Sequence, residues 1–311
     1  MRPVRPKSIS QKQIQQFQKE IWQYYARNKR DFPWRRPEHY GDPYKILVSE
    51  LMLQQTQASW VVGKYQEFIE KFPTFETLDR ASVAEVIAVW RGLGYNRRAL
   101  ALKKIAALAG EKWHYTLPKL SVEELDALPH IGYATACSIS AFAWNVRVSF
   151  IETNIRRVFI HRFFKGQTKV SDMDILALVE RMLPESDRGR VQNTSRSGPR
   201  EWYYALMDYG SMLKGVVENP NRQGKGYKRQ SAFVGSNRQV RGAILAVLAR
   251  PEYVNGCTKK VLLNGVRKNI LTPKSPKTLK VTQRDIDTNI TTLAQEGFLH
   301  ILGATVSLAK K

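Results

Sequence analysis

Cysteine is scarce in this sequence: Cys137 and Cys257 are the only two among its 311 residues. Two thiols cannot build a disulfide framework, a four-cysteine zinc site or a four-cysteine iron–sulfur cluster, so we predict a reduced, intracellular protein without a metal or iron–sulfur cofactor. Long apolar runs are also lacking, which excludes a membrane span of roughly 18 residues. The basic stretch 1–12 has no apolar segment after it and therefore predicts no secretory signal.

Acidic residues are few as well. The chain has 27 Asp and Glu against 50 Lys and Arg, which gives a formal net charge of +23. A hydrophobic fraction of 43% excludes wholesale disorder, and the length suggests two domains that each bury a core. Because so large a positive charge repels itself without a polyanionic partner, nucleic acid is the first expectation and an anionic membrane the second.

Helices dominate the first two-thirds of the chain. Apolar residues recur there at spacings of three and four, and no convincing period-two alternation precedes the C-terminal tail. The sequence therefore predicts an all-α architecture, with Trp22, Trp60, Trp90 and Trp202 in its core. The expected helices cover residues 10–28, 60–71, 83–90, 97–109, 133–143 and 201–213, and a further one begins near residue 43.

Residues 121–143 carry the pattern of two helices joined by a tight hairpin. Ser121 and Glu124 form a capping box for a short helix, which ends at the run 128–132, LPHIG. A second helix resumes at Tyr133. In a helix–hairpin–helix unit, the hairpin amides beside a helix N-terminus can bind a DNA phosphate. An ordinary helical turn is the alternative that the pattern leaves open.

A basic linker and a small second domain are predicted after a first domain that covers residues 8–216. The linker, residues 217–236, is polar and basic. The second domain, residues 237–311, has three helices followed by two short strands, which is the outline of a winged helix. Its helices are expected at 238–248, 259–269 and 282–296, and its strands at 297–303 and 305–308. Its many basic residues indicate DNA-backbone contacts, and docking of a protein is the alternative.

Two carboxylates stand out as candidates for chemistry. Glu50 lies in an apolar stretch of helix, where burial would raise its pKa and let it act as a general acid near neutral pH. Glu152 follows an apolar loop and directly precedes a predicted helix, so its charge can point toward an active site. Taken alone, however, an isolated Glu in a helix is more often a solvated or ion-paired residue.

Five short motifs occur in order between residues 10 and 215. They are PWR at 33–35, SELMLQQTQ at 49–57, WRGLGY at 90–95, LPHIG at 128–132 and ALMDYG at 205–210. Together they resemble the MutY-type adenine DNA glycosylases of the helix–hairpin–helix superfamily. The run around Glu50 is the most specific element, since it separates this branch from the endonuclease III branch.

The resemblance implies a monofunctional DNA glycosylase of base excision repair with a two-lobed helix–hairpin–helix fold. Such an enzyme flips adenine mispaired with guanine or 8-oxoguanine out of the duplex and hydrolyses its N-glycosidic bond. Glu50 matches the family's general acid, which protonates the adenine ring. Glu152 matches the second carboxylate, which stabilises the oxocarbenium-like sugar, and Asn154 matches the Asn that positions groups in the site.

The same resemblance implies which residues contact DNA. Gln55 and Tyr95 match residues that wedge into the base stack, while the others line the base pocket and its wall or belong to the hairpin. The expected DNA-binding residues are Trp34, Arg35, Leu53, Gln55, Thr56, Tyr95, His130, Gly132, Tyr133 and Thr135. The expected partner is double-stranded DNA with a mispair or damaged base, bound by a cytoplasmic, nucleoid-associated monomer without membrane contact.

Several positions depart from the family pattern. Glu152 replaces the usual Asp, and its extra methylene moves the charge by about one C–C bond. Ala134 stands where the lyase branch has its Schiff-base Lys, so lyase activity is not expected. Lys214 stands where the first iron–sulfur cysteine would be. The C-terminal domain is too short and too helical to resemble the family's 8-oxoguanine-reading domain.

Two other functions stay open on the sequence alone. The same fold could remove a mispaired thymine or uracil, or a modified base, although ring protonation by Glu50 helps adenine leave more than it helps thymine. A non-catalytic DNA-binding factor is the second alternative, and the retention of both carboxylates argues against it.

Overall fold

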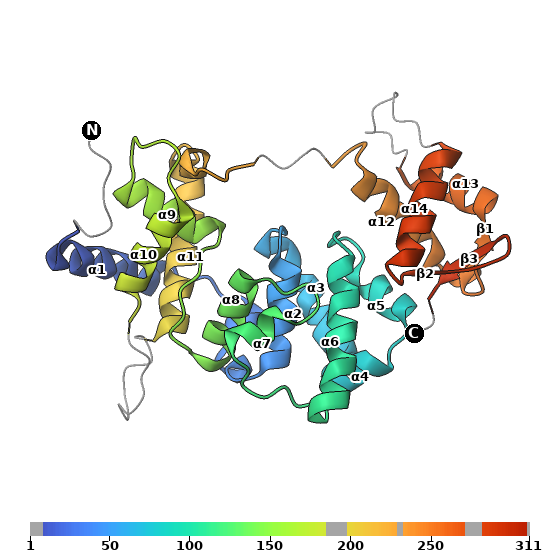
Figure 1. The fold of residues 1–311 in the computed structure, drawn as a ribbon, viewed down its shortest axis with the longest axis horizontal. Helices are drawn as coiled ribbons and strands as arrows, with labels where there is room; N and C mark the ends of the chain where they lie inside the picture. Colours follow the sequence, from blue (N-terminus) through green and yellow to red (C-terminus); the bar gives the residue numbers. More distant parts are fainter. Residues whose placement is uncertain (1–8, 185–197, 229–232, 271–281, 310–311) are drawn as a thin grey trace. The chain divides into compact units, whose positions relative to one another are not determined.

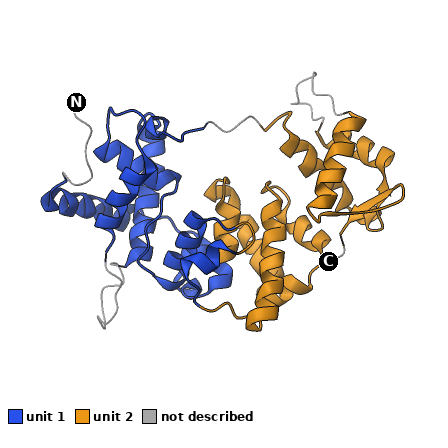
Figure 2. Ribbon diagram, viewed as in Figure 1, with its two compact units in different colours: residues 1–46, 119–127, 131–229 blue, residues 47–118, 128–130, 230–311 orange. Residues whose placement is uncertain are grey.

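The chain folds into two compact units, each assembled from separate stretches of sequence (Figure 2). Unit 1 contains residues 1–46, 119–127 and 131–229, and unit 2 contains residues 47–118, 128–130 and 230–311. The computed structural model describes residues 9–184, 198–228, 233–270 and 282–309. Both units consist mainly of helices (Figure 1), so the predicted all-α class is confirmed.

Unit 1 is a set of helices around one apolar core. Its helices are α1 (Gln11–Asn28), α7 (Val122–Asp126), α8 (Tyr133–Trp144), α9 (Thr153–Phe163), α10 (Asp172–Met182) and α11 (Pro199–Val216), with short 3-10 turns η2 (Pro33–Arg35), η3 (Pro37–His39) and η4 (Pro220–Gln223). Helix α11 packs against α9 and α1, and α7 packs against α8. As its spacing predicts, α1 is capped by Ser10 and buries Ile14, Phe17, Ile21 and Tyr25.

The first part of unit 2 is a second helical bundle. Its helices are α2 (Pro43–Leu53, whose first turn belongs to unit 1), α3 (Ala58–Lys71), α4 (Phe75–Arg80), α5 (Val83–Trp90) and α6 (Arg97–Trp113). Helix α4 packs on α6, and α5 packs on α3 and α6. The six-residue helix α4 was not predicted, because it is too short to show a helical period. Its capping box uses Thr74 and Thr77 rather than the usual Glu or Gln.

The last part of unit 2 has the element order of a winged helix. It contains α12 (Asn237–Leu248), η5 (Pro251–Tyr253), β1 (Cys257–Thr258), α13 (Lys259–Ile270), α14 (Gln283–Gln295), β2 (Leu299–Leu302) and β3 (Thr305–Leu308). The strands form an antiparallel sheet in the order β1-β3-β2. The three predicted helices and the final hairpin are present, while the two-residue strand β1 is too short for alternation to reveal.

Not all four tryptophans that were predicted to lie in the core are buried. Trp90 and Trp202 are fully buried, and Trp22 packs at the edge of the core of unit 1. Trp60 is 63% exposed, so its assignment to the core is wrong. It lies in the first turn of α3, on the solvent-facing side, and its indole N–H donates to the carbonyl oxygen of Gly92 at 3.2 Å.

Some predictions fall on residues that the structure leaves undescribed. Residues 185–197 of the predicted first domain and residues 229–232 of the predicted basic linker lie outside the described ranges. The division into domains 8–216, 217–236 and 237–311 stays a prediction. Within the described part of the chain, no helix combines the length and the hydropathy that crossing a membrane requires.

A buried ion pair connects the loop after α1 to α11. The side chain of Asp208 is 1% exposed and accepts from Arg35 Nη1 at 2.8 Å and from Arg30 Nε at 2.6 Å. The Arg35 guanidinium also lies over the Tyr204 ring, 4.4 Å from its centroid. Beside this pair, the buried Trp34 ring stacks on Phe32. The PWR and ALMDYG motifs therefore meet in the interior of unit 1.

Removing the charge of Asp208 should destabilise the protein strongly. Asp208→Asn keeps the shape of the side chain but leaves the Arg35 cation buried without its anion, so we expect the free energy of unfolding to fall by about 3 kcal/mol. Asp31→Asn is the control, because Asp31 is an exposed partner of Arg36 and its loss should cost less than about 1 kcal/mol. Urea denaturation measures both. Equal effects for the two variants would contradict the prediction.

Candidate active site and DNA-contacting surface

Glu50 lies near the end of α2 and is the one acidic residue in the sequence of that helix. Its neighbours Leu47, Val48, Leu51 and Met52 are buried, whereas the Glu50 side chain is only partly buried. Glu50 is therefore less buried than its apolar context predicts, because α2 turns its apolar side chains inward and leaves Glu50 at the border of the core. The residue is therefore partly exposed to solvent.

A buried arginine that the sequence analysis did not single out holds the chain that follows α2. Arg98, on α6, is 1% exposed. Its guanidinium donates to main-chain carbonyl oxygens at the end of α2 and in the loop before α6. These acceptors belong to Leu51, Met52, Gln54, Leu93, Gly94 and Tyr95, at 2.6 to 3.3 Å. One arginine thus satisfies the terminal carbonyls of α2 and fixes two loops together.

The electrostatics of Arg98 follow from its burial. Loss of water lowers its pKa to about 10, so the side chain remains charged at neutral pH. Its guanidinium lies 5.4 Å from the Trp90 ring centroid and 5.5 Å from that of Tyr95. Oriented carbonyl dipoles and aromatic faces therefore offset the loss of hydration.

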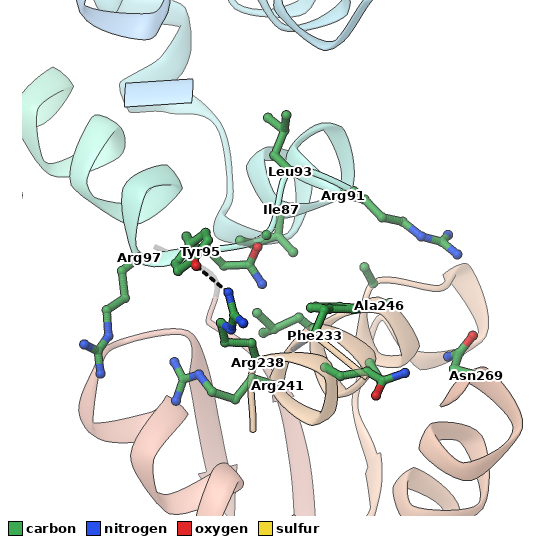
Figure 3. A pocket seen from close by; sticks show the side chains of 18 of the residues that line it. Ile87, Arg91, Leu93, Tyr95, Arg97, Phe233, Arg238, Arg241, Ala246 and Asn269 are labelled. Carbon is green, nitrogen blue, oxygen red and sulfur yellow. Dashed lines mark hydrogen bonds between the residues drawn. The ribbon is translucent and has the colours of Figure 1, made fainter. Parts of the chain in front are cut away.

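The two loops that Arg98 joins carry Gln55 and Tyr95. Both residues have left-handed backbone conformations, with φ of 54° and 45°, which cost non-glycine residues of order 1 kcal/mol each. Thr56 shares the same contact, since its hydroxyl accepts from Arg98 and donates to the Gln54 carbonyl at 3.2 Å. Gln55 and Tyr95 line one cleft of unit 2, where Figure 3 shows Tyr95. Leu53, just before them, is partly buried.

In unit 1, Glu152 is the N-cap of α9. Its Oε1 accepts from the backbone amides of Asn154 and Ile155 at 2.7 and 2.8 Å, and its Oε2 accepts from Asn154 Nδ2 at 3.2 Å. Burial raises the pKa of this half-buried carboxyl, while the two amides and the nearby Arg157 favour its anion. The carboxylate is therefore fixed in position at the positive end of a helix.

Asn154 connects Glu152 to α11 through Arg157. Its Oδ1 accepts from Arg157 Nη1 at 2.6 Å, and the same Nη1 donates to the Gly210 carbonyl of α11 at 2.6 Å. A Cβ on Gly210 would lie 2.4 Å from the Asn154 carbonyl oxygen. The glycine of the ALMDYG motif is therefore required for α11 to approach the start of α9.

The helix–hairpin–helix pattern appears as predicted in α7 and α8. Gly132 is the N-cap of α8 and provides no side-chain cap, so the amides of its first turn point to the surface. Gly132 and Tyr133 are exposed and Thr135 is partly exposed there, which gives the helix N-terminus the features of an anion site. His130 belongs to unit 2 and lines the cleft, and burial together with Arg98 and Arg97 lowers its pKa, so it is neutral at neutral pH.

Trp34 and Arg35 are not at a surface. Both are buried in unit 1, at 3% and 4% exposure. These two side chains can therefore affect a bound base only indirectly, by supporting the residues that pack on them. The contact of Arg35 with Asp208 connects motifs that lie far apart in the chain, and the sequence offers no local signal for it.

Metal ligands do not gather in the described residues, where no three His, Cys, Asp or Glu side chains form a group that could hold an ion. Cys137 is buried in α8, and burial raises the pKa of its thiol to about 11. A thiol with so high a pKa is a poor ligand and nucleophile at neutral pH.

Comparison with known proteins identifies the family. A family model described as HhH-GPD superfamily base excision DNA repair protein matches residues 48–185. The adenine DNA glycosylase of Mycobacterium tuberculosis (strain CDC 1551 / Oshkosh) is 33% identical over 255 residues, which covers 74% of this chain and 77% of that protein. The chain belongs to the adenine DNA glycosylase family. The resemblance drawn from the five motifs is thereby confirmed.

One further relative supports the family, and one solved structure supports the fold. The human adenine DNA glycosylase is 34% identical over 151 residues, covering 47% of this chain and 28% of that protein. Among solved structures, a thermostable thymine-DNA glycosylase superposes with a TM-score of 0.55 at 24% identity, over 69% of this chain and 94% of that one. At so low an identity, the second likeness supports the helix–hairpin–helix glycosylase fold alone.

Substitution of Arg98 should lower stability. Arg98→Met fills the same space but leaves the carbonyls of two loops without donors, so we expect the free energy of unfolding to fall by about 3 kcal/mol. Arg91→Met, an exposed neighbour, should change it by less than about 0.5 kcal/mol. Urea denaturation monitored by tryptophan fluorescence provides the measurement. A stable Arg98→Met protein would show that the loops do not depend on the guanidinium.

Glu152→Gln should change how stability depends on pH. Because the native pKa of Glu152 lies above its ordinary value, its favourable contribution is complete below the ordinary carboxyl pKa and is lost as the pH rises through the raised one. The variant cannot ionise, so it should gain stability relative to the wild type as the pH rises. Unfolding free energies between about pH 4 and pH 8 test this. A pH-independent difference between Glu152→Gln and the wild type would refute the expectation.

Proposed function

We propose that this chain hydrolyses the N-glycosidic bond between adenine and deoxyribose in duplex DNA, as a DNA N-glycosylase of base excision repair. The observation that carries the proposal is Glu50, the single acid of a mainly apolar helix, partly exposed at the border of the core in a chain that belongs to the adenine DNA glycosylase family. An acid so placed can protonate a bound base.

The proposed reaction has two stages. Glu50 donates its proton to a ring nitrogen of the extruded adenine, and the bond between the base and C1′ of the sugar then breaks with its electron pair leaving on adenine. The cationic sugar accepts a water oxygen at C1′, and the water proton is released to a base in the site. We assign no Schiff base to this chain, because Ala134 offers no amine.

Glu152 is the proposed anion that stabilises the cationic sugar. Two α9 amides and Asn154 hold its carboxylate in place, and Arg157 supports its anionic form. This arrangement suits electrostatic stabilisation, since a fixed charge needs no reorganisation when the sugar becomes cationic. Glu50 lies in the apolar stretch of α2 whereas Glu152 caps α9, so the two carboxyls lie in different environments and can take different roles.

The finer assignments extend the same proposal. We propose that the target adenine lies opposite guanine or 8-oxoguanine, that Gln55 and Tyr95 enter the base stack, and that the α8 N-terminus binds a phosphate. We also propose that the protein acts as a monomer without an iron–sulfur cluster, because two cysteines cannot supply its four ligands.

A panel of duplexes tests the function. Adenine opposite guanine or 8-oxoguanine should yield alkali-sensitive strand breaks, whereas duplexes with mispaired thymine or uracil, or with a modified base, should stay intact. Cleavage at thymine or uracil would show instead that the protein is a glycosylase for mispaired pyrimidines. Binding without breaks at any duplex would support a DNA-binding factor instead of an enzyme.

Glu50→Gln should abolish most activity while leaving DNA binding intact. The amide cannot donate an acidic proton, so we expect the single-turnover rate on an adenine–guanine duplex to fall by about 10²-fold to 10⁴-fold. The affinity for a duplex with an uncleavable abasic analogue should change by less than about threefold, within the usual effect of a surface substitution. The control is Glu67→Gln, an exposed acid on α3, which should excise adenine at the wild-type rate. A Glu50→Gln protein as fast as the wild type would exclude Glu50 as the acid.

A further inference from the structure

A cleft of about 990 Å³ lies within unit 2, between the loop before α6 and the C-terminal winged-helix-like part (Figure 3). One wall is the chain from Arg91 to Arg97, together with Gln55. The opposite wall is α12 with Phe233, which is 56% exposed. The C-terminal part thus faces the loop that carries Tyr95.

Positive charge lines this cleft from both walls. Arg91 and Arg97 come from the loop, Arg238 and Arg241 come from α12, and none of the described lining residues is acidic. A concave surface with four guanidinium groups concentrates positive potential and attracts a polyanion. Guanidinium groups are also well suited to bind phosphate oxygens in a bidentate manner.

A carboxylate already bridges the two walls. Glu296, at the end of α14, pairs with Arg97 Nη2 at 2.6 Å and with Arg241 Nη2 at 2.5 Å. The Arg97 side chain is 61% exposed in spite of this pair. Two guanidinium groups that converge on one pair of carboxylate oxygens form the donor geometry that a phosphodiester also accepts.

An aromatic surface lies beside these charges. The Tyr95 ring has the Arg98 guanidinium 5.5 Å from its centroid and the Arg238 guanidinium 5.3 Å from it. Arg238 also donates to the Tyr95 hydroxyl, as the dashed line in Figure 3 shows. Tyr95 and Gln55 both have strained left-handed backbones and both line the cleft. Aromatic rings held next to phosphate-binding side chains are typical of sites that bind nucleotides of a DNA strand.

We propose that this cleft is a DNA-binding site built jointly by two parts of unit 2, in which Arg238 and Arg241 of α12 bind phosphates of the strand whose bases contact Tyr95 and Gln55. The proposal rests on the proposed function in one respect, namely that DNA is the substrate. According to this proposal, α12 of the C-terminal part binds DNA beside Tyr95 and Gln55, at the target base. It does more than add general affinity for the DNA backbone.

The test compares two double variants with the same loss of charge. Arg238→Gln with Arg241→Gln removes the α12 arginines, and Lys260→Gln with Lys268→Gln removes two exposed charges of α13 in the same part of the chain. Fluorescence anisotropy gives the Kd for a duplex with an uncleavable abasic analogue opposite guanine, at several salt concentrations. Each lost phosphate contact should reduce the slope of log K against log salt by about 0.9.

We expect the arginine variant to bind about tenfold or more weakly at 0.1 M salt, with a slope smaller by about 1.8, while the lysine variant keeps the wild-type slope. Arg238→Lys with Arg241→Lys retains the charge and should restore most of the slope, which separates phosphate binding from misfolding. An unchanged slope in the glutamine variant, an equal loss in the α13 control, or tighter binding by the glutamine variant would each overturn the proposal.

The assay also separates this proposal from the proposed function, because the abasic analogue requires no excision. A wild-type protein that binds it with the expected slope but releases no adenine would refute the glycosylase function and leave the cleft assignment standing. A wild-type protein that excises adenine, together with an arginine variant that binds like the wild type, would refute the cleft assignment alone.

Discussion

The hydrogen bonds of Arg98 are the constraint on which the candidate site of unit 2 depends. A cation with 1% exposure is costly unless its donors are satisfied, and here the acceptors are carbonyl oxygens from two loops far apart in sequence. Because the guanidinium is planar and rigid, it fixes the end of the Glu50 helix and the Tyr95 loop with one set of bonds. The strained conformations of Gln55 and Tyr95 persist because this clamp outweighs their cost.

Unit 1 uses a related device around its own carboxylate. Glu152 caps α9, Asn154 accepts from Arg157, and Arg157 reaches the carbonyl of Gly210 on α11. Glu152 is both the N-cap of α9 and the proposed stabilising anion, so the helix that it caps fixes its position. An Asp to Glu change is compatible with this arrangement, since the longer side chain still reaches two amides and the Asn154 side chain.

Part of the positive charge of the molecule is concentrated around one cleft of unit 2. A net charge of +23 suggests a polyanionic partner but does not say where that partner binds. The structure gathers Arg91, Arg97, Arg238 and Arg241 around one cleft and sets the Glu296 carboxylate between two of them. Electrostatic attraction and an aromatic surface therefore coincide at the place where two parts of the chain meet within the unit.

The sequence by itself determined the all-α class, most helix positions, the final hairpin and the family, because helical periodicity, capping residues and short motifs are local properties of the chain. It also singled out Glu50 and Glu152 by their residue type and context. Only the tertiary structure decided that Trp60 is exposed, that Arg35 pairs with buried Asp208, that Arg98 clamps two loops and that α12 faces Tyr95. Periodicity indicates which face of a helix is apolar, but the partner that covers that face, or that neutralises a buried charge, comes from residues distant in sequence and is fixed only when the chain has folded.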